Sequence, residues 1–146
     1  MKKILTFAFF VLTFFNNLSA QNKNVSKSII NPMAYVSKFH EKSELDGMQK
    51  GGLVELYLER IRVLVHRIPF IALTNKTGIS MQDVGIPENS GYNKFLDKQH
   101  EAIKYFLSET ESCQKSITPF ADKNNIINAI LAYETILKDL RMLHDN

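Results

Sequence analysis

The stretch from Leu53 to Leu73, LVELYLERIRVLVHRIPFIAL, most constrains what this chain can fold into. It is long enough to span a membrane and rich in apolar residues, yet it carries five charged residues between positions 55 and 67. Five charges are too costly for a helix that faces lipid. Placed at 100° per position, its apolar side chains gather on one broad face. We therefore predict an amphipathic core helix, which Pro69 ends or kinks.

Three sets of side chains follow from this spacing. The broad apolar face comprises Leu53, Val54, Tyr57, Leu58, Ile61, Leu64, Val65 and Ile68. The polar side chains form two rows, one of Glu55, Glu59, Arg62 and His66 and the other of Arg60 and Arg67. His66 is therefore expected to face solvent as part of a surface row. Between the two rows an apolar residue recurs every seven positions, at Leu56, Val63 and Phe70. These three are expected either to be covered by a short preceding helix or to form an exposed strip that contacts a partner.

Three further helices are predicted around this one. The first spans residues 31–46, with Asn31 as its N-cap and Pro32 at the first helical position. The third covers residues 92–117, and the fourth follows Asp122 as its cap. No period-two alternation of useful length occurs, which argues against a sheet. The expected fold is all-α, a single-domain antiparallel bundle of about four helices with a long loop between the second and third.

The spacing also predicts which side chains of the last two helices are buried. The inner face of the third helix is expected to contain Tyr92, Phe95, Leu96, Ile103, Phe106, Leu107, Cys113 and Ile117. That of the fourth is expected to contain Ile126, Ala129, Ile130, Tyr133, Ile136, Leu137, Leu140 and Leu143. Cys113 is the only cysteine, so no intrachain disulfide is possible, and its place on an apolar face predicts a buried thiol.

The loop from Thr74 to Gly91 is long for a connection in a compact domain, and such loops are often functional. Ser80 and Asp83 are spaced as a capping box for one helical turn, which Gly85 would close. The loop also carries four apolar side chains that either pack over the end of the bundle or contact a partner: Ile79, Met81, Val84 and Ile86.

The N-terminus predicts export. A basic start is followed by an apolar run over residues 4–15 and by small residues before Gln21, the layout of a secretory signal peptide at residues 1–20. Residues 21–30 are expected to form a flexible leader and residues 31–146 the bundle domain, located in the periplasm or secreted. The whole chain has 18 basic and 15 acidic residues. The signal peptide holds two of the lysines and no acidic residue, so the net charge of the mature chain is 16 − 15 = +1. This near-neutral charge gives no reason to expect nucleic acid as a partner.

Two weak patterns point to a metal or a haem. Asp97 and His100 place a carboxylate and an imidazole on adjacent turns, where they would share a metal ion. Met33 and His144 would lie at neighbouring ends of an antiparallel bundle. That layout is similar to the four-helix haem cytochromes, and the resemblance, which covers only these single residues, implies Met33 and His144 as haem ligands.

The sequence holds no recognisable nucleophile, catalytic base or phosphate-binding motif. We therefore expect a non-catalytic binding or accessory protein that needs no cofactor and recognises another protein or a small apolar ligand. A haem- or metal-binding bundle is the alternative. The oligomeric state is left open by the sequence.

Overall fold

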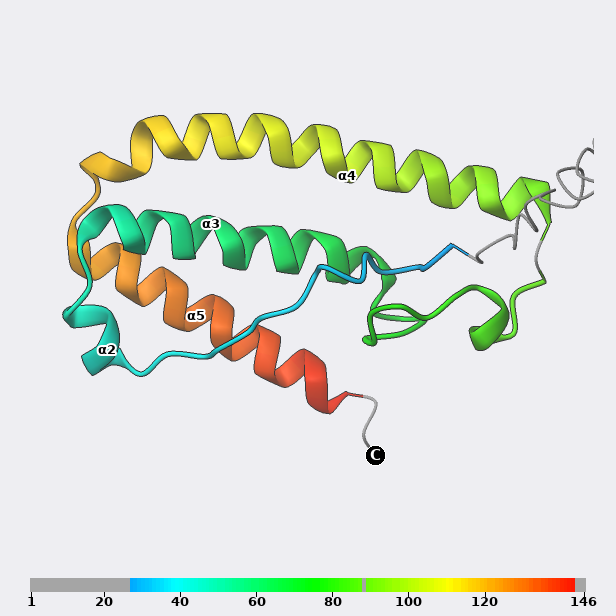
Figure 1. Cartoon of the computed structure of the whole chain (residues 1–146), viewed down its shortest axis with the longest axis horizontal. Helices are drawn as coiled ribbons and strands as arrows, with labels where there is room; N and C mark the ends of the chain where they lie inside the picture. Colours follow the sequence, from blue (N-terminus) through cyan, green and yellow to red (C-terminus); the bar gives the residue numbers. More distant parts are fainter. Residues whose placement is uncertain (1–26, 88, 144–146) are drawn as a thin grey trace, which may run out of the picture.

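The computed structural model describes residues 27–87 and 89–143. In these ranges four α-helices follow one another (Figure 1): α2 (Lys42–Asp46), α3 (Lys50–Arg67), α4 (Ser90–Ile117) and α5 (Lys123–Met142). This part of the chain contains no strand, only an isolated bridge between Ser28 and Ser80. The predicted all-α fold with four helices is therefore confirmed. The predicted signal peptide at residues 1–20 and His144 lie outside the described residues.

The helix α3 occupies the middle of the molecule, with α4 along one side and α5 along the other (Figure 1). The chain direction makes α4 antiparallel to both α3 and α5. The short α2 packs against α5 near the start of α3. Of the helices that the structure describes, none has the length and apolar character needed to cross a membrane.

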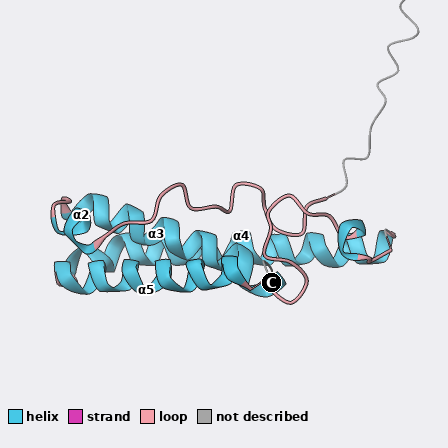
Figure 2. Cartoon of the chain, turned by 90° about the horizontal axis from the view of Figure 1, so that it is seen from below, coloured by secondary structure: helices cyan, strands magenta, loops and turns pink. Residues whose placement is uncertain are grey.

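Residues 27–41 form an extended segment. The predicted helix over residues 31–46 is therefore wrong for residues 31–41, and only its last part is helical, as α2. The side-chain oxygen of Asn31 accepts a hydrogen bond from the backbone N–H of Met33 at 2.9 Å. This bond makes the Asn-Pro pair a local turn instead of a helix start. From there the segment runs along one side of the helices to α2 (Figure 2).

Side chains of the three long helices satisfy the backbone of this segment, which has no neighbouring strand to pair with. Four donors bind its carbonyl oxygens: Arg67 Nε binds Ala34 at 3.0 Å, Arg60 Nη2 binds Lys38 at 2.7 Å, Arg141 Nη2 binds Val36 at 3.2 Å and His100 Nε2 binds Ile29 at 2.9 Å. Arg60 and Arg67 are consequently buried, which corrects their assignment to an exposed polar row.

The extended segment and α2 also cover the apolar residues that recur every seven positions in α3. Val63 packs in one cluster with Val36, and Phe70 in another with Ile29 and Ile30. Leu56 lies in a third cluster together with Leu45 of α2. The alternative of an exposed contact strip at Leu56, Val63 and Phe70 is therefore wrong. Ile29 and Ile30 are core residues, although the sequence placed them in the flexible leader.

A buried ion pair joins α3, α5 and the extended segment. Arg60 and Glu134 are each only 1% exposed, and Arg60 Nη2 donates to Glu134 Oε1 at 2.7 Å. The backbone N–H of His40 donates to Glu134 Oε2 at 2.7 Å. Arg60 Nη1 lies 2.9 Å from Glu59 Oε1 as an ion pair without hydrogen-bond geometry. Burial by itself raises the pKa of Glu134, but the hydrogen bonds from His40 and Arg60 outweigh burial and hold that pKa below its usual value.

Capping residues define the ends of the later elements. Asn89 accepts a bond from Tyr92 N at the start of α4. Asp122, the predicted cap of the fourth helix, accepts one from Asn124 N at the start of α5. A 3-10 turn over Thr118–Phe120 separates these two helices.

In the loop before α4, Ser80 and Asp83 bond to one another around a single 3-10 turn over Gln82–Val84. Gly85 ends the turn with φ at +78°, a conformation that favours glycine.

The ion pair leads to a stability prediction. The Glu134→Gln substitution keeps the shape of the side chain but removes the buried counter-ion of Arg60 and leaves it only the more exposed Glu59 carboxylate, which costs about 3–5 kcal/mol of unfolding free energy. Urea denaturation at neutral pH measures this loss. The double variant Arg60→Met with Glu134→Leu removes both charges and should lose much less. An unfolding free energy for Glu134→Gln within about 0.5 kcal/mol of the wild type, as for an ordinary surface site, contradicts this account.

Candidate functional site

The helix α4 buries only a narrow face. Its buried residues are Leu96, Ile103 and Leu107, which pack toward the core. Beside them runs a second row of uncharged residues that the structure leaves at least partly exposed, here called the α4 strip: Tyr92, Phe95, Gln99, Ala102, Phe106, Thr110, Cys113, Ile117 and, just beyond the helix, Phe120.

Large apolar side chains dominate the α4 strip. The exposed fractions are 68% for Phe95, 52% for Phe106, 54% for Ile117 and 90% for Phe120. The prediction that Phe95, Phe106 and Ile117 are core residues is therefore wrong. Cys113 is exposed as well, which corrects the predicted buried thiol. The physical reason is that α4 packs mainly on α3 among the long helices, so the row meets other parts of the described chain chiefly at grooves near its two ends.

A groove of about 460 Å³ lies at the C-terminal end of the α4 strip. Its walls are Ile117 and Phe120 on one side and Ala129 of α5 on the other, and Tyr57 of α3 also lines it. The same faces of α3 and α5 continue along the molecule at exposed positions: Ile68 follows Tyr57 by eleven residues and Ile136 follows Ala129 by seven. α4, α3 and α5 therefore all contribute apolar side chains to this groove, and α3 and α5 carry further exposed ones. Ile136 and Leu143 were both predicted to lie in the core, but the structure leaves both exposed.

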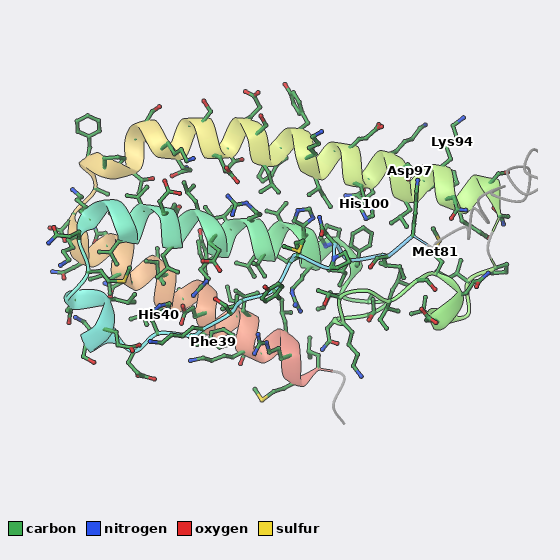
Figure 3. All side chains as sticks on the ribbon, viewed as in Figure 1. Phe39, His40, Met81, Lys94, Asp97 and His100 are labelled. Atoms are coloured by element: carbon green, nitrogen blue, oxygen red, sulfur yellow. The ribbon has the colours of Figure 1, made fainter. Side chains whose placement is uncertain are left out.

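A second apolar groove, of about 530 Å³, lies at the N-terminal end of the α4 strip. Tyr92 and Phe95 line it from α4, and the loop and the end of α3 supply the opposite wall with Phe70, Met81 and Ile86. Three predicted partner-binding residues thus line one groove. Two other loop residues, Ile79 and Val84, are half-buried, and Val84 packs against the adjacent core cluster. Figure 3 shows Met81 on the loop below the N-terminal part of α4.

A polar groove of about 660 Å³ lies on another side of α4. It brings together His66 of α3, which was predicted to lie on the surface, and His100 of α4, which was predicted as a metal ligand. Most of its other charged groups are paired: Lys27 with Asp97, and Arg62 Nη2 with Glu111 Oε1 at 2.6 Å. His66 is half-buried, which corrects its predicted solvated position. Burial lowers the pKa of His66, and the nearby His100 and Arg62 lower it further.

The residues proposed as metal ligands have protein partners instead. Asp97 forms its ion pair with Lys27, while His100 donates to the Ile29 carbonyl and meets the Phe70 ring edge-on (Figure 3). Within residues 27–87 and 89–143 no three metal-ligating side chains cluster. Met33 lies exposed in the extended segment, and its suggested partner His144 is outside the described residues.

Comparison with known proteins gives no match: no family, no curated protein and no solved structure is similar to this chain. The properties of its own residues must therefore indicate the function. Among its surfaces, the α4 strip with its two grooves combines the largest apolar side chains with the greatest exposure.

The lowered pKa of His66 predicts a pH effect on stability. Folding disfavours the protonated form of His66, whereas the unfolded chain takes up a proton near the usual pKa of about 6.5. Stability from this residue is thus present above that pH and is lost as the pH falls below it. His66→Gln should flatten the dependence of the unfolding free energy on pH between about 7.5 and 5.5, a window above the usual pKa of the carboxylates. Equal slopes for variant and wild type in urea titrations argue against this assignment.

Proposed function

We propose that this chain is an exported, non-catalytic protein that works by binding another protein through the α4 strip. The observation that carries the proposal is the exposure of Phe95, Phe106, Ile117 and Phe120 along one side of a 28-residue helix. Single exposed apolar residues are common on protein surfaces, but a contiguous row of large ones marks an interaction surface. Aromatic side chains are also enriched at the centres of protein interfaces.

The shape of this surface favours a helical occupant. At the groove of about 460 Å³ the α4 strip forms one wall, α5 forms another, and Tyr57 of α3 also lines it. An amphipathic helix placed in such a groove buries its apolar face on residues three and four positions apart. The partner that fits is therefore a protein that presents an amphipathic helix.

The polar groove is the less favourable alternative as the site of function. Two ion pairs, Lys27 with Asp97 and Arg62 with Glu111, already neutralise most of its charge. His100 is held by the Ile29 carbonyl as part of the packing of the extended segment. These groups have structural partners, whereas the α4 strip leaves its contacts unmade.

Export of the protein rests on the layout of residues 1–20. Expression of the full chain in a secreting host, followed by N-terminal sequencing of the mature protein, tests it. We expect the mature chain to begin at Gln21, because the small residues Ser19 and Ala20 precede it. A chain that keeps Met1 and stays in the cytoplasm contradicts export.

Binding through the α4 strip can be tested by site-specific photo-crosslinking. We expect the photoreactive analogue p-benzoylphenylalanine, placed at Phe106, to form a discrete covalent adduct with a protein. Placed at the neighbouring exposed Tyr105, which points to another side of α4, it should give little adduct. A Phe95→Asp change in the Phe106 probe protein should abolish the adduct, because it puts a charge into the apolar surface.

Two outcomes of this experiment contradict the proposed function. One is the absence of any protein adduct from position 106. The other is equal labelling from positions 105 and 106, which indicates random collision and not a defined contact surface.

A further inference from the structure

The residues of the α4 strip are spaced symmetrically about Phe106, and its large side chains match large ones. Phe95 and Ile117 each lie 11 residues from Phe106, and Tyr92 and Phe120 each lie 14 residues from it. The remaining positions are equally spaced too, with Gln99 and Cys113 at 7 residues and Ala102 and Thr110 at 4 residues, and none of these four is charged. In a two-fold antiparallel pair centred on Phe106, residues at equal distances from it face one another, so this spacing sets large apolar side chains against large apolar side chains.

Helix geometry keeps the matched residues in line. Eleven residues make three turns of an α-helix almost without remainder, so Phe95, Phe106 and Ile117 stand above one another along α4. Two copies of α4 that pack antiparallel about a two-fold axis at Phe106 would place the two Phe106 rings in contact. The same arrangement sets Phe95 against Ile117 of the second copy, and the reverse.

The two apolar grooves fit this arrangement at its ends. The groove lined by Phe70, Met81 and Ile86 lies beside Tyr92 and Phe95. In the antiparallel pair this end meets the opposite end of the second copy, where Phe120 is 90% exposed. The most exposed aromatic side chain would thus enter an apolar groove, and the two-fold axis makes the exchange mutual.

The charge and area of the surface also fit a dimer. None of the nine residues of the α4 strip is charged, so its burial desolvates no ion. At about 200 Å² for a fully exposed large side chain, the exposed parts of the five large strip residues together with Ile68 and Ile136 amount to about 800 Å² in each copy. That is about the area which one partner contributes to a specific interface of standard size.

We propose that the partner at the α4 strip is a second copy of this chain, bound as a two-fold symmetric dimer in which the α4 helices pack antiparallel with Phe106 on the axis. This inference rests on the proposed function of the α4 strip and names its occupant.

Sedimentation of the purified mature protein tests the dimer directly. We expect a dimer at micromolar concentrations that dissociates on dilution. Phe106→Glu should weaken the association by at least about 30-fold, the effect of removing one central contact. Tyr105→Glu adds the same charge at the adjacent exposed position and should leave the dimer intact. Circular dichroism of both variants checks that the helices form, which the exposure of both side chains favours.

Cysteine crosslinking tests the register and does not depend on a disruptive variant. In the antiparallel pair, position 99 of one copy lies opposite Cys113 of the other. The Gln99→Cys variant, which retains Cys113, should therefore oxidise rapidly to a covalent dimer. Glu101→Cys, on the far side of α4 from the strip, should crosslink at the slow rate of the wild type.

The outcomes separate this inference from the proposed function. A monomer at all concentrations, together with a photo-crosslinked adduct of a different protein at position 106, overturns the dimer but keeps the function. A monomer without any adduct overturns both. A dimer that survives Phe106→Glu, or that crosslinks equally from positions 99 and 101, shows that the copies associate elsewhere and overturns the inference.

Discussion

The buried ion pair between Arg60 and Glu134 is the interaction on which the rest of the structure depends. Burying two charges is costly and is offset only by good pair geometry and further hydrogen bonds. All polar side-chain atoms of the pair have a hydrogen-bond partner except Arg60 Nη1, which lies beside Glu59 Oε1 as an ion pair. Here the partners come from three parts of the chain, because His40 and Lys38 of the extended segment bind the same two side chains. The pair therefore fixes α3, α5 and the extended segment relative to one another.

This constraint decides which faces of α3 are covered. The extended segment follows the arginine side of α3 and buries Val63 and Phe70 there. α5 and α4 occupy two further sides. Because residues 27–41 are extended over that side, no fourth long helix is present among the described residues to cover the α4 strip. The α4 strip is thus exposed because the N-terminal part of the domain forms an extended segment on another side of α3. The uncovered strip leaves room for a helix from a partner.

The sequence was sufficient to predict the long helices and their ends. Their signals are local: the 3.6-residue period of α3, Asp122 before α5, Thr118-Pro119 after α4, and the Ser80 and Asp83 cap around one turn in the loop. The extended segment was missed because Asn31-Pro32 is compatible both with a helix start and with a turn, and the carbonyl partners that decide between them are distant in sequence.

The candidate site was harder to predict, for a related reason. Helical spacing shows that Phe95, Phe106 and Ile117 share a side of α4, but it does not show whether another element covers that side. The expectation of a closed bundle therefore placed these three residues in the core. Arg60 was misplaced by the same limitation, since a polar residue on a helix wheel is read as exposed unless its buried partner is known.

The most direct test of the central claim is a nuclear Overhauser contact between the Phe95 ring and the Ile117 methyl groups. These residues are 22 positions apart on one straight helix, a distance of about 33 Å, so a contact between them has to join two chains. The antiparallel dimer predicts this contact in concentrated samples of the mature protein and its loss in Phe106→Glu. If the spectra show Phe95 and Ile117 in contact only with neighbours in their own chain at every concentration, the α4 strip is not an interface between copies.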